Sequence, residues 1–204
     1  MDATPDRPPR IAPLPRSEWG REEIDALAPM TPPPDSTYAK RRSERGGAGG
    51  VGALALMLRN PAACKAFMEF NRHLLYESSL DERLRELVVL RIAWQLRSEY
   101  EWGQHMPVAI DCGMSDEEID RIMVGPDAPG WSDFDAAALR ATDGLLAEGQ
   151  IDDASWATLA ASLDDPAMLD LIFTVGGYAT VAMVFNASGL RLDADIVGFP
   201  PNGR

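Results

Sequence analysis

The 204-residue chain is long enough for one hydrophobic core, and its 46% hydrophobic and 25% charged residues are ordinary for a soluble globular protein. Its formal net charge of -13 argues against a nucleic-acid partner, because an acidic surface repels a phosphate backbone. The 8 basic and 8 acidic side chains of residues 1–50 cancel, so the whole net charge lies in residues 51–204. We therefore expect an N-terminal arm and linker over residues 1–50 and a globular domain over residues 51–204.

The arm is rich in proline, with nine of the 16 prolines in its first 34 residues. Between these prolines, residues 17–27 predict a short helix capped by Ser17. Residues 40–50, which are basic and then glycine-rich, are typical of a flexible linker, with an anion-binding patch as the alternative. The apolar side chains Ile11 and Trp19 indicate that the arm packs on another surface, such as a neighbouring subunit.

Cellular location is indicated by two features of the sequence. The N-terminal residues lack the apolar stretch of a secretory signal peptide. The two cysteines, Cys64 and Cys112, are typical of buried thiols in a reducing compartment, and a disulfide is the alternative. We therefore expect a cytoplasmic protein.

From residue 51 onward the hydrophobic pattern is helical, and no stretch alternates with a period of two. Asn60 followed by Pro61 is typical of a helix start, and the pairs Ser79/Glu82 and Ser115/Glu118 have the spacing of capping boxes. The predicted helices cover about residues 61–76, 79–96, 115–123, 132–148, 152–163 and 165–188. The fold class that this pattern predicts is all-α.

Residues 171–190 carry no charge, and a run of 20 such residues is long enough to span a membrane. The polar side chains Thr174, Thr180 and Asn186 dilute its apolar character, and no basic cluster flanks it. We interpret this segment as the buried central helix of an oligomer, and we expect no membrane partner.

Residues 86–113 carry the polar side chains Glu86, Ser98, Glu101 and His105 in an otherwise apolar helical region. Glu101 lies four residues before His105, so the two share a face of a helix, and Ser98 lies two turns before His105 on the same side. A carboxylate beside an imidazole suits proton transfer near neutral pH. His105 as a core histidine bonded to a backbone carbonyl is the alternative.

The spacing of these residues resembles a known family. Glu86, eleven residues, Ser98, two residues, Glu101, three residues and His105 is similar to the frame of the carboxymuconolactone decarboxylase and alkylhydroperoxidase D (AhpD) superfamily. Ala109 and Gly113 continue that frame with the family's spacing after the histidine. In the peroxidase branch, a Cys-x-x-Cys motif occupies the positions of Ser98 and Glu101, so the resemblance is to the decarboxylase branch.

The resemblance covers about residues 50–190 and implies an AhpD-like helical bundle that forms a trimer or hexamer. It implies a cofactor-independent carboxy-lyase that removes CO2 from a small carboxylated lactone or related acid, with His105, Glu86 and Glu101 as catalytic residues. Glu101 and His105 also have the spacing of two metal ligands, but a third ligand is not evident in the sequence. We therefore expect no metal and no cofactor.

The buried position expected for Glu86 leaves two interpretations open, a proton relay to His105 or an internal ion pair with Arg83, Arg85 or Arg91. Glu101 is interpreted as a general acid or base or as a residue that orients His105, with an exposed surface glutamate as the alternative.

Four further residues are candidates for substrate binding: Ser98, Arg97, Trp102 and Tyr178. Arg97, or alternatively Arg91, would bind a substrate carboxylate, which a guanidinium fits with two hydrogen bonds. Trp102 and Tyr178 would line a pocket or pack in the core. Ser98 would donate a hydrogen bond or merely fill space, because no triad pattern makes it a nucleophile.

Two other functions remain open. An AhpD-like peroxidase is disfavoured because Ser98 and Glu101 replace the motif cysteines, so Cys64 or Cys112 would have to act from other positions. A non-catalytic oligomeric protein that binds a small molecule in the same pocket is the other alternative.

Overall fold

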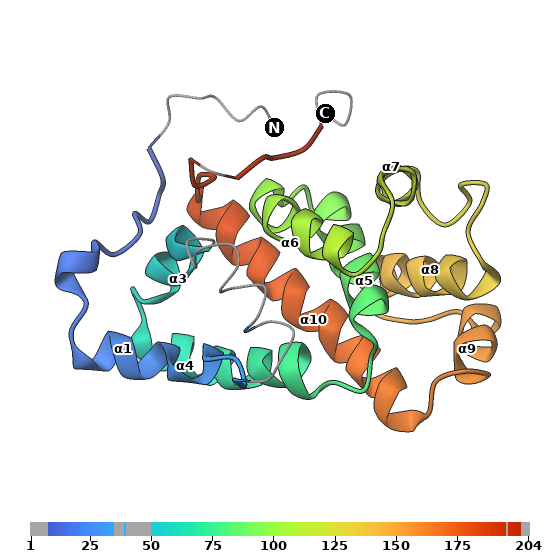
Figure 1. Ribbon diagram of the computed structural model, residues 1–204, viewed down its shortest axis with the longest axis horizontal. Coiled ribbons are helices and arrows are strands. Elements are labelled where there is room, and N and C mark those ends of the chain that lie inside the picture. The colour runs from blue at the N-terminus through green and yellow to red at the C-terminus, as the bar shows by residue number, and fades with distance from the viewer. Residues whose placement is uncertain (1–7, 35–38, 40–49, 195, 201–204) are drawn as a thin grey trace.

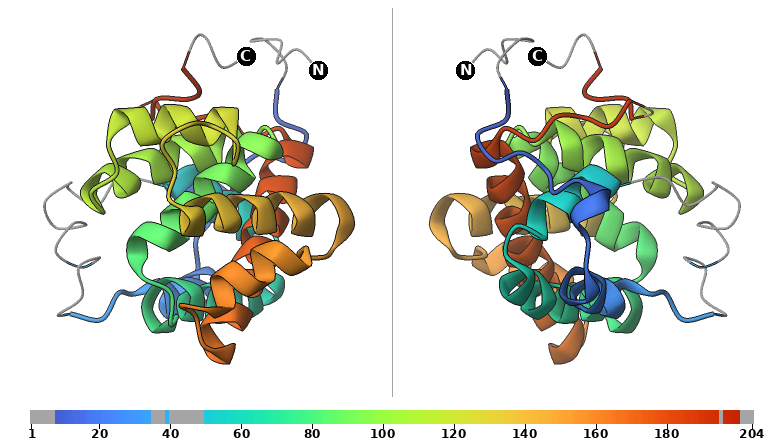
Figure 2. Two further views of the ribbon diagram at one scale, coloured as in Figure 1. Left: turned by 90° about the vertical axis from the view of Figure 1, so that its right-hand side faces the viewer. Right: turned by 90° about the vertical axis from the view of Figure 1, so that its left-hand side faces the viewer.

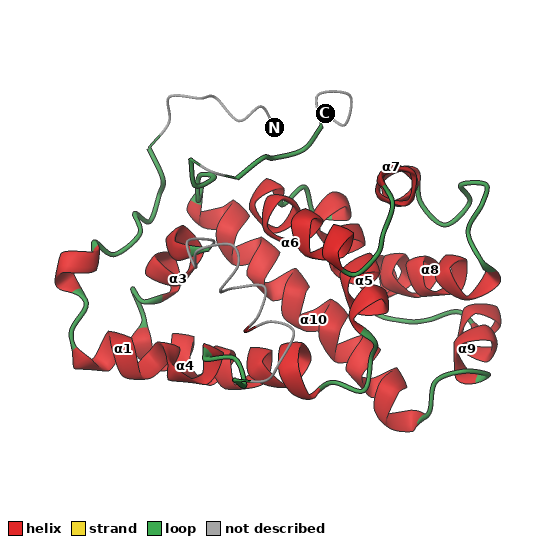
Figure 3. Cartoon of the chain, viewed as in Figure 1, coloured by secondary structure: helices red, strands yellow, loops and turns green. Residues whose placement is uncertain are grey.

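The structure is a computed structural model that describes residues 8–34, 39, 50–194 and 196–200. Every regular element in these ranges is helical, which confirms the all-α class (Figure 3). The elements in chain order are η1 (Arg16–Glu18), α1 (Arg21–Leu27), η2 (Ala28–Met30), α3 (Val51–Met57), α4 (Pro61–Arg72), η3 (His73–Glu77), α5 (Glu82–Gln95), α6 (Glu99–Asp111), α7 (Asp116–Val124), α8 (Asp133–Glu148), α9 (Asp153–Ala160) and α10 (Asp165–Ser188).

Helix α5 forms the centre of the bundle and packs on α6, α8 and α10. Its residues 84–93 are all buried, and most of them belong to residues 87–96, whose nearly continuous apolar pattern predicts a central helix. Figure 1 shows α10 running diagonally between α6 and α4, with α8 and α9 together at one end of the molecule. Because α5 is enclosed on several sides, each polar side chain on it needs a partner from a neighbouring helix or from its own.

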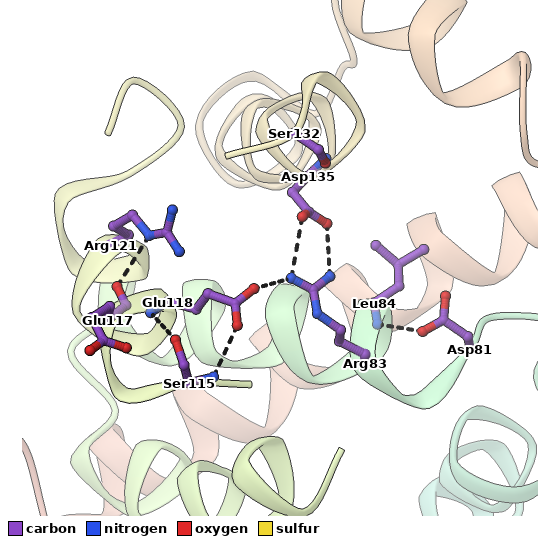
Figure 4. A network of polar contacts seen from close by, with 9 residues as sticks. All are labelled: Asp81, Arg83, Leu84, Ser115, Glu117, Glu118, Arg121, Ser132 and Asp135. Atoms are coloured by element: carbon purple, nitrogen blue, oxygen red, sulfur yellow. Dashed lines mark hydrogen bonds and ion pairs between the residues drawn. The ribbon is translucent and has the colours of Figure 1, made fainter. Parts of the chain in front are cut away.

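Side-chain caps fix the starts of several helices where the sequence predicts them. Asn60, Ser132 and Asp152 each accept a hydrogen bond from a backbone N–H in the first turn of the helix that follows. Ser115 and Glu118 form the predicted reciprocal capping box at the start of α7 (Figure 4).

The predicted capping box of Ser79 and Glu82 is wrong. Helix α5 begins at Glu82, after Asp81, whose carboxylate accepts a hydrogen bond from the backbone N–H of Leu84 at 2.9 Å. The backbone N–H of Ser79 instead donates to Asp170 of α10 at 2.6 Å. Helix α5 is therefore capped by Asp81, two residues after the predicted cap, while Ser79 binds a distant segment.

The described part of the N-terminal arm packs on the helices of its own chain. Helix α1 begins at Arg21 after Gly20, so the predicted start at Ser17 is wrong, and residues 16–18 form only a 3₁₀ turn. The arm buries Ala26 in a cluster with Leu58, Cys64 and Met68, with Trp19 packed against it. The basic part of the linker, residues 40–49, lies outside the described residues, so its predicted flexibility and anion-binding role stay predictions.

Three helices are joined by Arg83 near the start of α5. Its guanidinium donates to both carboxylate oxygens of Asp135 in α8, at 3.0 and 3.2 Å, and to Glu118 in α7 (Figure 4). These charges hold the pKa of Arg83 above its ordinary value, although burial acts in the opposite direction. Arg83 is therefore a structural clamp, and it does not pair with Glu86.

The C-terminal segment crosses over α6, as the side views in Figure 2 show. A Cβ at Gly103 would overlap the side chain of Ile196 and the carbonyl of Val197, so α6 needs glycine at this position. Phe199 packs edge-on against Trp94, with ring centroids 5.3 Å apart, and also contacts Trp102. Gly103 therefore allows the C-terminal segment to pack closely on α6, which continues past Pro107 to Asp111.

Helix α10 is long and apolar enough, by length and composition, to span a membrane. Within its most apolar 18-residue window, 61% of the residues are buried inside the protein, and the buried core helix of a soluble protein meets the same criterion. Its other face is open and carries Leu169, Phe173 and Met183, each about half exposed.

Candidate functional site

The centre of the candidate site is an ion pair between α5 and α6. The imidazole Nδ1 of His105 lies 2.7 Å from Oε2 of Glu86, and the Glu86 side chain is completely buried. The two helices are joined by a tight turn in which Arg97 has a positive φ of 54°. This turn folds α6 back onto α5 and brings together two residues that are 19 positions apart in the sequence.

Glu86 has a second partner in Arg85, the residue before it. The guanidinium Nε of Arg85 donates to Oε1 of Glu86 at 3.1 Å, so the two carboxylate oxygens serve different cations. Both sequence interpretations of Glu86 therefore describe its geometry, since it contacts His105 and is also in an internal ion pair. Of the three arginines considered, Arg83 binds Asp135 and Glu118, and Arg91 binds Asp143.

Glu101 approaches the other imidazole nitrogen. Its Oε2 lies 3.7 Å from Nε2 of His105, which is longer than an ordinary hydrogen bond. Its side chain is nearly buried, which corrects the interpretation of Glu101 as an exposed surface glutamate. The imidazole thus has one nitrogen fixed by Glu86 and the other facing a second carboxyl group.

The charges of these groups are set by burial and by one another. Burial raises the pKa of Glu101 to about 7, and the negative charge of Glu86 adds to this effect. For His105, burial acts to lower the pKa, but the charge and hydrogen bond of Glu86 outweigh it and hold the pKa above its ordinary value. Burial likewise acts to raise the pKa of Glu86, but His105 and Arg85 outweigh it and hold the pKa below its ordinary value. A charged Glu86–His105 pair therefore lies beside a carboxyl group that titrates near neutral pH.

Tyr178 of α10 completes one side of the site. Its ring meets the imidazole of His105 edge-on, with centroids 5.0 Å apart. Tyr178 is nearly buried, so it packs in the core and also borders the imidazole. The structure thus places Tyr178 beside His105, and its substrate-binding role stays a prediction.

Ser98 lies at the start of α6 rather than two turns before His105 within one helix. It is the N-cap residue of α6, but its side chain makes no capping hydrogen bond. The hydroxyl is buried and has no hydrogen-bond partner among the residues that the structure describes. Ser98 itself is completely buried, and its substrate-binding role stays a prediction.

The structure places Arg97 and Trp102 in an aromatic cluster. The guanidinium of Arg97 lies over the Trp94 ring, 4.5 Å from its centroid, and 5.1 Å from that of Phe199. Trp102 is 1% exposed and belongs to the main hydrophobic core, which supports the packing alternative for this residue. Packing in this cluster accounts for the positions of both side chains, and their substrate-binding roles remain predictions.

Arg91, the alternative carboxylate ligand, is engaged elsewhere. It donates two hydrogen bonds of 2.7 Å to Asp143 and a third of 2.7 Å to the carbonyl of Ile122. Three good hydrogen bonds in a buried setting make this guanidinium a structural tie between α5, α7 and α8. Among the described residues, no group of three or more histidine, cysteine, aspartate or glutamate side chains is arranged to hold a metal ion.

Comparison with solved structures defines the class of fold. A peroxidase-related protein with an AhpD core from Ralstonia eutropha JMP134 has a TM-score of 0.65 at 16% identity, covering 82% of this chain and 90% of its own. A peroxidase-related protein from Silicibacter sp. TM1040 has a TM-score of 0.65 at 16% identity, covering 83% and 92%. A protein of unknown function from Agrobacterium tumefaciens, described as a candidate antioxidant defence protein AhpD, has a TM-score of 0.61 at 20% identity, covering 67% and 94%. At these identities the likeness establishes the AhpD-like fold alone.

Part of the sequence also matches a family model. The model of the carboxymuconolactone decarboxylase family matches residues 61–144, which contain Glu86, Ser98, Glu101 and His105. This match confirms the resemblance to that family which the spacing of the site residues predicts. Among curated proteins, none matches this sequence.

Proposed function

We propose that this protein is a cofactor-independent carboxy-lyase, which acts on a small carboxylated lactone or a related acid through proton transfer by His105. The observation that carries the proposal is the buried 2.7 Å contact between Glu86 and the Nδ1 atom of His105. It leaves Nε2 as the atom that exchanges a proton with a substrate, with Glu101 beside it. A fixed imidazole tautomer with a neighbouring carboxyl group is the arrangement that general acid–base catalysis needs.

The proposed reaction has two steps. The bond between the substrate's ring carbon and its carboxylate breaks, CO2 leaves, and the bonding electrons remain on the ring as a dienolate. The imidazolium of His105 then donates its Nε2 proton to a carbon of the dienolate, which gives the conjugated lactone. The carboxyl group of Glu101 returns a proton to the imidazole and is itself reprotonated from water, so the site ends as it began.

Electrostatics support His105 as the proton donor. Glu86 holds the imidazole in its protonated form, because the pKa of His105 is raised by this carboxylate. The imidazolium also offers a positive charge to a developing dienolate. We assign the substrate carboxylate to no arginine, since Arg91 is bound to Asp143 and Arg97 is stacked on Trp94.

Peroxidase activity is the second candidate, because two of the solved structures with this fold are described as peroxidase-related. The cysteines of this chain argue against it. Cys64 is buried, and burial raises its pKa to about 11, which suppresses the reactive thiolate. Cys112 lies at the end of α6, with its sulfur 3.8 Å from Glu82. Neither thiol occupies the position of Ser98 or Glu101.

We propose that the protein is a homo-oligomer, a trimer or hexamer as the family resemblance implies. The exposed face of α10 supports self-association, because Phe173 and Met183 follow Leu169 by four and fourteen residues, about 1.1 and 3.9 helical turns, so the three lie on one side of the helix. An apolar face of this length is typical of a protein interface. We further propose a cytoplasmic location and a small-molecule substrate as the partner of the site.

The test of the proposed activity is to follow CO2 release or the ultraviolet absorbance of substrate with a panel of carboxylated lactones and β-keto acids. Turnover of at least one compound, with strong loss in the His105→Ala variant, would support the proposal. If the protein binds members of the panel without turning any over, the non-catalytic binding function replaces the lyase.

A further inference from the structure

We propose that Arg85 is a positioning residue for the Glu86–His105 pair, holding the carboxylate of Glu86 in the single orientation that presents Oε2 to the imidazole. The proposal deepens the proposed function and rests on it to the extent that His105 is the proton-transfer residue. The evidence for it is the set of contacts made by the Arg85 guanidinium, a group that takes no direct part in the proposed reaction.

The contact between Arg85 and Glu86 is unusual for a helix. Side chains of adjacent residues leave a helix about 100° apart and do not normally face each other. Here the Arg85 side chain nevertheless reaches Glu86, and its Nε donates to Oε1 at 3.1 Å. Both side chains are almost fully buried, at 2% and 0% exposure, so the pair cannot be a solvated surface interaction.

The other end of the guanidinium is held by the backbone. Nη1 of Arg85 lies 3.4 Å from the carbonyl oxygen of Leu75, within the π-helical turn η3. Carbonyl groups near the end of a helix lack donors from the following turn, so this one accepts from a side chain. Arg85 thus links the turn after α4 to the carboxylate of the site, and its position depends on the fold rather than on solvent.

Two consequences for His105 follow from this geometry. With Oε1 taken by Arg85, rotation of the Glu86 carboxylate would break a buried charged hydrogen bond, so Oε2 stays directed at Nδ1. The positive charge of Arg85 also opposes protonation of His105, against the effect of the two carboxylates Glu86 and Glu101. The groups that face the imidazole are therefore Glu86 and Arg85 from α5, Glu101 from α6 and Tyr178 from α10.

The test uses the fact that the chain has only two histidines, His73 and His105. In ¹⁵N-labelled protein, the imidazole nitrogens of both can be followed by NMR as a function of pH without any substrate. Arg85→Met should raise the titration midpoint of His105 by roughly 1 pH unit, because a positive charge near the imidazolium is lost. At high pH the neutral imidazole should change from the tautomer protonated at Nδ1 to a mixture of both tautomers.

Matched variants distinguish the loss of Glu86 positioning from a general disturbance of the fold. Arg83→Met removes another paired arginine of α5 but should leave the titration of His105 unchanged, since Arg83 binds Asp135 and Glu118. Arg85→Lys retains the charge and should return the His105 midpoint toward that of the wild type. A folded Arg85→Met protein whose His105 midpoint and tautomer match the wild type would overturn the proposal.

A measurement on the wild-type protein covers the case in which Arg85→Met does not fold. The Nε–H resonance of Arg85 should shift with the same midpoint as His105, because both donate to one carboxylate. A resonance that stays constant through that titration would overturn the proposal. If these NMR results hold but no acid in the panel is turned over, the proposed lyase activity fails and the positioning role of Arg85 stands.

Discussion

Glu101 lies one helical turn before His105, and its Oε2 is 3.7 Å from Nε2 of the imidazole. On the opposite side of the ring, Glu86 is 2.7 Å from Nδ1. Glu86 is thus within hydrogen-bonding distance of the imidazole and Glu101 is not, and the proposed mechanism gives the two carboxyl groups different roles. Burial and the charge of Glu86 raise the pKa of Glu101 to about 7, whereas the pKa of Glu86 is lowered.

The first prediction concerns the pH dependence of the reaction. Because Glu101 supplies a proton in its neutral form, kcat should fall as the pH rises through about 7, the pKa at which Glu101 ionises. Glu101→Gln should lower kcat and remove this ionisation from the profile. A variant profile with the same midpoint near 7 would assign the ionisation to another group. Glu99→Gln, a change in the same turn of α6, should keep the wild-type profile.

The second prediction concerns the charge of His105. Glu86→Gln preserves the shape of the side chain but removes the negative charge that raises the pKa of the imidazole. The NMR titration midpoint of His105 should therefore move to lower pH. An unchanged His105 midpoint would show that Glu86 does not control its protonation.

The third prediction concerns redox chemistry. Consumption of hydroperoxides with a dithiol reductant should be negligible, because the positions of Ser98 and Glu101 offer no thiolate and no resolving partner. The measurement is the rate of peroxide loss for the wild type beside Cys64→Ser and Cys112→Ser variants. A robust rate that Cys112→Ser abolishes would establish a peroxidase with its centre at the end of α6.

The fourth prediction concerns assembly. Met183→Glu and Phe173→Glu place a charge on the exposed face of α10 and should dissociate the oligomer, measured by light scattering at micromolar concentration. Val124→Glu is the matched control, since Val124 is also exposed but lies on α7. A monomeric wild-type protein would contradict the proposal. If the control variant also dissociates, the exposed face of α10 is not the specific interface.

The sequence predicts the helices well because their signals are local. Caps such as Asn60 and Ser132 act within one turn, and the apolar pattern of residues 87–96 correctly predicts that α5 is central. The predicted cap at Ser79 is wrong because its backbone N–H binds Asp170, 91 residues away in the sequence. The residues next to Ser79 in the sequence do not indicate a contact with a residue so far away.

The candidate site was predictable only in part, for the same reason. The spacing of Glu86, Glu101 and His105 resembles a family pattern, so these residues could be named together before their contacts were known. The choice of Arg85 among three nearby arginines depends on how α5 packs against η3, which the sequence does not reveal. Likewise, the stacking of Arg97 on Trp94 depends on the positive φ in the turn before α6.

The central claim is that His105, held by Glu86, transfers the proton during decarboxylation. The most direct test compares the wild type, His105→Ala and the control variant His73→Ala in the assay for CO2 release. His105→Ala should lower the rate by a factor of about 100 to 10,000, the usual range for loss of a general acid or base, while the control stays close to the wild type. A His105→Ala variant with full activity on a substrate that the wild type turns over would contradict the claim.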